Sequence, residues 1–244
     1  MLTIKNNAEV AEIYISGGIV DDDEGSWIRG WRDGDTTGYE FPTKLKEQLD
    51  AIKDKALEIH INSQGGNVFA GVAMANLIAN HKPKTTAIID GIAASIASQI
   101  FFSADVCRMP SNAYLMIHRP YSVLEGNADE LRKAAEILDT LQEGLETTYR
   151  KKALDGITDE DIHEMMNSET WFTGTQAAEK FRVEVTEPLT MINGIATEKE
   201  FRNIHFKNMP KSISGFFLPK NAEDINQINK VLAEAKTLLL NRER

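Results

Sequence analysis

Short apolar segments alternate with glycine-containing turns and amphipathic segments along most of this chain. The segments with β-branched and aromatic residues predict strands at residues 11–19, 57–61, 85–89, 105–109 and 113–117. Amphipathic spacing predicts helices at residues 42–55, from 68 to about 79, at 128–153 and at 158–167. Strands that alternate with helices predict an α/β domain, with functional groups where strands lead into helices.

Several local features refine this expectation. The polar stretch 21–39 contains four glycines and predicts a loop or mobile segment. Residues 62–66 predict a tight polar turn, because two glycines end it. The helix after this turn is expected to bury one apolar face, formed by Val68, Val72, Ala75 and Ala79.

Composition limits the classes of protein. The chain has 244 residues, of which 42% are apolar, which suits one large α/β domain or one domain with an extension. The net charge is −10 and no block of Lys and Arg stands out, so nucleic-acid binding is disfavoured. Cys107 is the single cysteine, so no internal disulfide forms, and no Cys/His cluster has metal-ligand spacing. We expect no metal or cofactor and a cytoplasmic location.

Membrane and secretory roles are also disfavoured. The N-terminus has no basic segment followed by an apolar one, so no secretory signal is expected. The longest apolar stretch, Thr85 to Ala104, contains Asp90, Ser95 and Gln99, which a bilayer would leave in lipid. We interpret this stretch as buried core.

The long helix at 128–153 carries a stripe of apolar residues at spacings of three and four. Its members are Leu131, Ala134, Leu138, Leu141 and Leu145. Such a stripe is typical of a helix lying on its own core, and also of a projecting handle that joins subunits. The length of the helix keeps the second interpretation open.

The C-terminal part changes character. Thr173 and Gln176 predict a capping box for a short helix. Beyond Pro188, glycines and prolines interrupt the pattern, and a last amphipathic helix is expected at about 222–241. We therefore expect a main domain at residues 1–189 and an extension at 190–244.

Three features could carry chemistry. The glycine turn at 62–67 could offer backbone N–H groups to an anionic oxygen. Ser95 stands at an expected strand-to-helix junction, where a serine is either a helix cap or a nucleophile. His118 ends an apolar strand and is either a structural histidine or a general base. Each feature alone is weak.

Together these residues resemble the ClpP family of serine peptidases. The similarity rests on four segments in series: NSQGG (62–66), GIAAS (91–95), MIHRP (116–120) and WFTGTQAA (171–178). It covers roughly residues 10–188, although Gln64 stands where the family commonly has proline. The segment at 68–71 and the residues before Trp171 look most like the ClpP-like head maturation proteases of bacteriophages and prophages. The implied fold is a ClpP/crotonase-like repeated ββα superhelix with a long protruding handle helix.

The resemblance also implies residue roles. Ser95 would be the nucleophile, His118 its general base and Glu169 the third catalytic residue, with Asp159, Asp161 and Glu164 as nearby rivals. The oxyanion hole would be the N–H groups of Gly66 and Ile96. Substrate contacts would come from Gly65, Asn67, Arg119 and Pro120.

The resemblance implies a homo-oligomer of heptameric rings stacked into a tetradecamer, which hydrolyses peptide or protein substrates through an acyl-enzyme. Phage capsid or scaffold proteins are the expected substrates, in the host cytoplasm if a phage encodes the chain. An AAA+ unfoldase partner is less expected, because residues 21–39 do not resemble an unfoldase-engaging loop. Three alternatives stay open: a Ser-Lys signal-peptide-peptidase-like hydrolase, a crotonase-type acyl-CoA enzyme and a catalytically silent ring or scaffold component.

Overall fold

A computed structural model describes residues 10–52, 54–188 and 206–210. The chain up to Asn208 forms one compact unit, and the chain from Met209 onward belongs to a second. The helix expected at 222–241, and most of the expected extension, lie outside the described residues. All the strands and helices described belong to the first unit.

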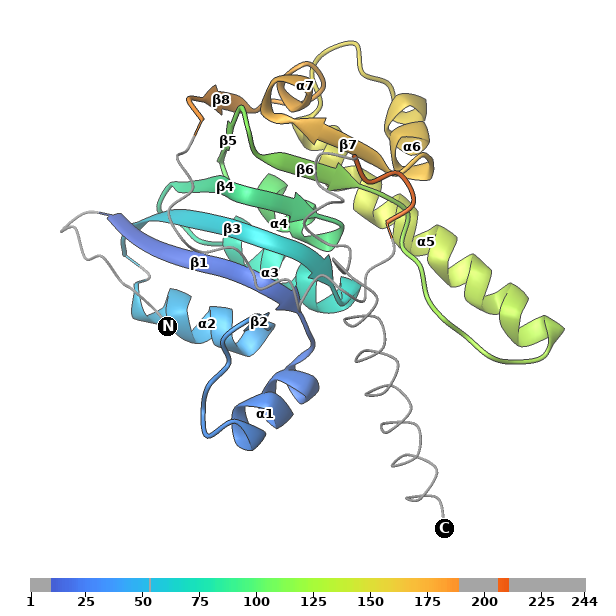
Figure 1. Ribbon diagram of the computed structural model, residues 1–244, viewed down its shortest axis with the longest axis horizontal. Helices are drawn as coiled ribbons and strands as arrows, with labels where there is room; N and C mark the ends of the chain where they lie inside the picture. The colour runs from blue at the N-terminus through green and yellow to red at the C-terminus, as the bar shows by residue number, and fades with distance from the viewer. Residues whose placement is uncertain (1–9, 53, 189–205, 211–244) are drawn as a thin grey trace, which may run out of the picture. The chain divides into compact units, whose positions relative to one another are not determined.

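A mostly parallel sheet organises the described residues of this unit (Figure 1). Its strands are β1 (Val10–Ile19), β2 (Tyr39–Glu40), β3 (Ala56–Gly66), β4 (Thr85–Ala94), β5 (Val106–Pro110), β6 (Tyr114–Ile117), β7 (Thr170–Thr173) and β8 (Glu184–Thr186). The order is β2-β1-β3-β4-β5-β8, while β6 pairs in parallel with β4 and antiparallel with β7. The expected α/β class is confirmed.

The described helices lie around this sheet, and those after α1 share one apolar core with its strands. They are α1 (Asp22–Trp31), α2 (Pro42–Ala51), α3 (Val68–Ala79), α4 (Ile96–Ser103), α5 (Ala128–Lys152), α6 (Asp159–Asn167) and α7 (Gly174–Ala178). Helix α4 is central, since it packs against α3, α5, β3 and β4. Ile100 and Phe101 on α4 are fully buried, as expected for the apolar stretch around them. None of the described helices is long and apolar enough to cross a membrane.

The expectation of a loop across residues 21–39 is wrong, because residues 22–31 form α1. The side chain of Asp21 accepts a hydrogen bond from Glu24 N at 2.9 Å, and three acidic residues in the first turn favour the helix dipole. Gly25 looked like a helix breaker. Within the helix, however, it makes room for the ring of Phe41, which is 1% exposed.

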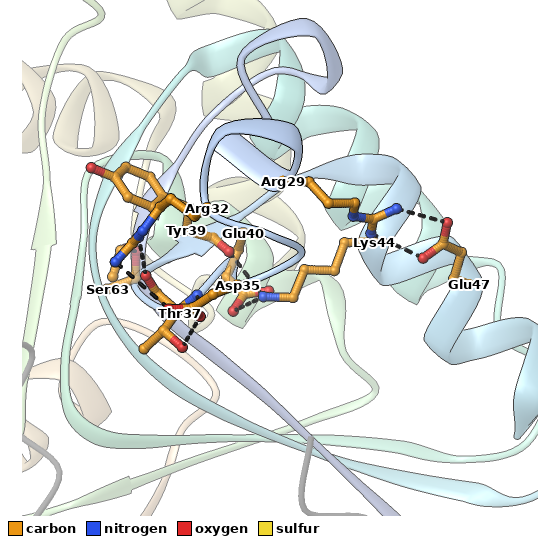
Figure 2. A network of polar contacts seen from close by, with 10 residues as sticks. Arg29, Arg32, Asp35, Thr37, Tyr39, Glu40, Lys44, Glu47 and Ser63 are labelled. Atoms are coloured by element: carbon orange, nitrogen blue, oxygen red, sulfur yellow. Dashed lines mark hydrogen bonds and ion pairs between the residues drawn. The ribbon is translucent and has the colours of Figure 1, made fainter. Parts of the chain in front are cut away.

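A network of polar contacts links residues of the segment that connects α1 to α2 (Figure 2). Arg32 Nη1 donates to Thr37 O at 3.1 Å, and Thr37 donates to Asp35 through both its N–H and its hydroxyl. Lys44 Nζ donates to Glu40 Oε1 at 2.9 Å; nevertheless, burial raises the pKa of Glu40 to about 7. These bonds order the chain on both sides of β2, which pairs in parallel with the end of β1.

Two boundaries and one buried stripe also differ from the sequence expectation. The expected turn at 62–66 is the end of β3, because these residues still pair with β1 across a register shift. Helix α2 stops at Ala51 rather than at residue 55. The buried stripe of α3 is also different from the expected one, because Val72 is exposed. Its buried members are Ala70, Gly71, Met74 and Ile78.

Helix α5 begins after Asn127, whose side chain forms a capping box with Glu130, close to the expected start. Its apolar stripe divides along its length. Leu145 lies in the core at 7% exposure, together with Tyr149, as a helix lying on its own core requires. Leu131, in contrast, is 44% exposed, and this first half of α5 extends away from the sheet (Figure 1).

Two glycines of α1 give a matched stability test. A Cβ at Gly25 would lie 2.5 Å from the Phe41 ring, whereas a Cβ at Gly30 would meet nothing within 4 Å. We expect Gly25→Ala to lower the free energy of unfolding by about 1–3 kcal/mol through overpacking. Gly30→Ala should leave it unchanged or raise it by about 0.5 kcal/mol. Urea unfolding followed by circular dichroism measures both, and equal effects would contradict the Gly25–Phe41 packing.

Candidate active site

The register of three parallel strands brings distant residues to one place. Ala93 of β4 pairs with Ser63 of β3 on one side and with Leu115 of β6 on the other. Further along the chain, β3 ends at Gly66, β4 is followed by Ser95 and β6 is followed by His118. Parallel strands present their carboxyl ends at the same edge, where α/β proteins form their sites.

Ser95 occupies a strained junction between β4 and α4. Its φ of 55° and ψ of −130° are rare for a residue with a Cβ. Its side chain makes no capping bond to α4. Instead, Ser95 Oγ and His118 Nε2 are 2.7 Å apart, within hydrogen-bonding distance. The geometry therefore fits a nucleophile and its base better than a helix cap.

The pair of glycines that ends β3, Gly65 and Gly66, packs directly on this serine. A Cβ at Gly65 would lie 2.7 Å from Ala94 O and 2.8 Å from Ser95 Cβ, so no larger residue fits without displacement. Gly66 has a φ of 151°, and a Cβ there would lie 2.0 Å from Ile19 O. Both positions require glycine. This close approach puts the backbone of the turn beside the N-terminus of α4, which starts at Ile96.

Hydrogen bonds of the Ser63 side chain hold the backbone of these glycines in place. Ser63 Oγ donates to Gly17 O at 2.6 Å and accepts from Gly65 N at 3.1 Å. Asn67 was expected to contact substrate, but its side chain caps α3 by accepting from Ala70 N at 3.0 Å. Gly65 is itself buried, whereas Gly66 is exposed. Gly66 is therefore the glycine of the pair that a substrate could reach.

Glu169 lies opposite His118 because β7 runs antiparallel to β6. Ile117 pairs with Thr170, so the next residue along β6 faces the residue before β7. Glu169 is 8% exposed and has a φ of 49°, in the left-handed region where glycine usually follows a helix. Keeping a glutamate at such a position points to a use for its side chain.

The carboxylate of Glu169 has three hydrogen-bond donors among the described residues. They are Trp171 Nε1 at 3.3 Å, Lys207 N at 2.8 Å and Asn208 N at 2.7 Å. No hydrogen bond within the described ranges joins this carboxylate to His118. The rival acids Asp159, Asp161 and Glu164 are exposed on α6. Asp161 is engaged in the capping box of that helix.

The surroundings of His118 favour the neutral form of its ring. Burial lowers the pKa of His118, the nearby Glu169 carboxylate raises it, and Lys207 lowers it again. The aromatic rings of Tyr121 and Phe206 lie edge-on, with centroids 5.9 and 6.3 Å from the imidazole. A neutral imidazole can accept a proton, as a general base must.

A cavity of about 10 Å³ lies beside Ser95 and His118. Its walls include Val68, Ile96, Gln99, Pro120, Leu145 and Tyr149. Pro120, an expected substrate contact, thus borders the site. Arg119 instead points to α5, where its Nε donates to Gln142 at 3.1 Å and its Nη2 pairs with Asp139. Among the residues that the structure describes, no three His, Cys, Asp or Glu side chains are grouped so that they could hold a metal ion.

One comparison with known proteins bears on this geometry. A family model described as Clp protease matches residues 43–183. The chain belongs to the Clp protease family. The match makes it a peptidase with a ClpP-like fold, and the matched region contains Ser95, His118 and Glu169.

The site also contains residues that sequence reasoning missed. Lys207 and Asn208 reach Glu169 through their backbone amides, a contact with no sequence signature. Trp171 was recognised within a motif but not as a hydrogen-bond donor to Glu169.

The charges around His118 predict a pH profile for the reaction of Ser95 with a fluorophosphonate. Because the pKa of His118 is lowered from 6.5, the neutral base persists to more acidic pH. We expect the labelling rate to rise with pH to a plateau, with a midpoint below 6.5. Glu169→Gln removes the charge that raises this pKa, so its midpoint should lie lower still. A wild-type midpoint above 6.5 would contradict this description of the site.

Proposed function

We propose that this Clp protease family member is a serine endopeptidase in which Ser95 is the nucleophile and His118 the general base. The observation that carries the proposal is the 2.7 Å distance between Ser95 Oγ and His118 Nε2. Three further residues take supporting roles. Glu169 orients the imidazole, and the N–H groups of Gly66 and Ile96 form the oxyanion hole.

The proposed chemistry has two halves. Ser95 Oγ attacks the substrate carbonyl carbon while His118 Nε2 takes the hydroxyl proton, which makes a weak nucleophile effective. The carbonyl oxygen becomes an oxyanion, stabilised by the two backbone N–H groups. When the C–N bond breaks, His118 gives the proton to the leaving amine, and an ester to Ser95 remains.

Water completes the cycle. His118 takes a proton from the water that attacks the ester, and the second tetrahedral intermediate breaks its bond to Ser95 Oγ. The proton returns to Ser95, and a free carboxylic acid leaves. The N-terminal end of α4 favours the negative charge at both stages, because its first amides have no partner within the helix.

Ser95→Ala tests the nucleophile. We expect it to abolish fluorophosphonate labelling and to lower kcat for a peptide substrate by about 10⁴-fold or more, because no other group can form the ester. Ser103→Ala, at the far end of α4, should keep both activities. Labelling of another serine, or unchanged turnover in Ser95→Ala, would overturn the assignment. Absence of both activities in the wild type would favour a silent ring component.

The proposed assembly is a homo-oligomer of heptameric rings stacked into a tetradecamer, with the first half of α5 as the handle that joins copies. A group of exposed apolar side chains supports it: Phe69 on α3, Tyr121, Val123 and Leu124 before α5, and Leu131 and Ile137 on α5. Phe69 and Ile137 line a groove of about 430 Å³ with Leu141. Exposed apolar surface of this kind is typical of subunit interfaces.

Ile137→Glu tests the handle. Ile137 is 51% exposed, so the substitution should not disturb the core, but it places a charge in the proposed interface. We expect a smaller species by size-exclusion chromatography with light scattering. Lys151→Ala, exposed near the end of α5, should elute as the wild type does. An unchanged mass for Ile137→Glu would contradict the handle.

We propose phage capsid or scaffold proteins as the substrates, rather than proteins supplied by an AAA+ unfoldase. Support comes from the similarity of residues 68–71 and of the segment before Trp171 to phage head maturation proteases. Purified capsid and scaffold proteins, incubated without ATP, should be cut by the wild type and not by Ser95→Ala. Cleavage that requires an unfoldase and ATP would favour general degradation.

A further inference from the structure

Residues Phe206, Lys207 and Asn208, here called the 206–208 segment, lie against the candidate active site from beyond the matched family region. Lys207 N donates to Glu169 Oε2 at 2.8 Å, and Asn208 N donates to Glu169 Oε1 at 2.7 Å. Asn208 Nδ2 also donates to Ser168 O at 2.5 Å. Each carboxylate oxygen therefore accepts from the segment, and the segment is anchored on the neighbouring residue as well.

The same carboxylate is the group that would orient His118. An orienting acid must present an oxygen to imidazole Nδ1, as in serine peptidases generally. Across the described residues, Glu169 makes no hydrogen bond to His118, although Ser95 and His118 are already paired. The serine–imidazole pair is thus assembled, while the third side chain is engaged elsewhere.

We propose that the 206–208 segment is an intramolecular inhibitor that binds the Glu169 carboxylate and withholds it from His118. The inference rests on the proposed function, because inhibition presupposes that Glu169 serves His118 in catalysis. Its recognition is by main chain. Two successive backbone amides donate to the carboxylate, and any extended segment without proline could bind it in this way.

Two side chains of the segment act in the same direction. The Phe206 ring lies edge-on to both Trp171 and His118, with centroids 5.2 and 6.3 Å away, and so occupies space beside the imidazole. Lys207 brings a positive charge towards His118 and lowers its pKa, against the effect of Glu169. A cation near the imidazole opposes the imidazolium that must form when Ser95 loses its proton.

Lys207→Pro in the full chain tests the inhibition, because proline has no N–H to donate. Lys207→Ala is its control, since it removes the same charge but keeps the amide. Loss of one charge-assisted hydrogen bond shifts such an equilibrium by roughly tenfold or more. We expect kcat/KM for a short peptide to rise about tenfold in Lys207→Pro relative to Lys207→Ala. An equal or lower value would overturn the inhibition, a lower one making the segment a positioning element for Glu169.

Amide hydrogen exchange tests the contact without relying on hydrolysis. In the Ser95→Ala protein, the amides of Lys207 and Asn208 should be protected, and additional Glu169→Ala should remove that protection. Glu160→Ala, on exposed α6 surface, should leave it intact. Protection that does not depend on Glu169 would overturn the inference while leaving the proposed function standing. A third outcome is protection that depends on Glu169 in a protein whose Ser95, where present, is never labelled by the fluorophosphonate. That outcome would contradict both the proposed function and the inhibitory role.

Discussion

The site depends on the parallel alignment of β3, β4 and β6. Ser95 and His118 are 23 residues apart in sequence, but each directly follows the last residue of its strand, and the two strands are hydrogen-bonded neighbours. Ser95 N donates to Met116 O at 3.0 Å, so the pairing of β4 with β6 extends to Ser95 itself. A slip of one residue in either strand would turn one of the two side chains to the opposite face.

Two residues of the candidate site have a strained backbone. Ser95 and Glu169 both have positive φ, which costs of order 1–3 kcal/mol for each residue with a Cβ. Packing on either side holds them in place: residues 96–102 of α4 are all buried after Ser95, and Ile162 and Met166 of α6 are buried before Glu169. The rigid core thus maintains conformations that the local sequence alone would not favour.

The sequence predicted those features that depend on residues close together along the chain. The alternation of strands and helices, the capping box of α7, and the placement of Ser95 and His118 at strand ends are consequences of apolar patterns and turn residues. Gly25 gave a misleading signal, because its role is to admit the Phe41 ring, a tertiary requirement. Strand β7 was not foreseen, so Glu169 could be chosen only through the family resemblance and not through its register with β6. The 206–208 segment left no signal, because backbone amides are present in almost every residue.

The burial of Glu169 links these findings. A carboxylate at 8% exposure is costly unless donors satisfy it, and it must therefore keep partners in every state of the site. Trp171 Nε1 supplies one donor from within the fold, while Lys207 N and Asn208 N supply two from a segment outside the sheet. Under the proposal, the imidazole of His118 would replace these donors when the segment leaves and would then gain its orienting acid. Under the proposal, the contact that satisfies the buried charge of Glu169 also withholds this carboxylate from His118, so an exchange of its partners would switch the site.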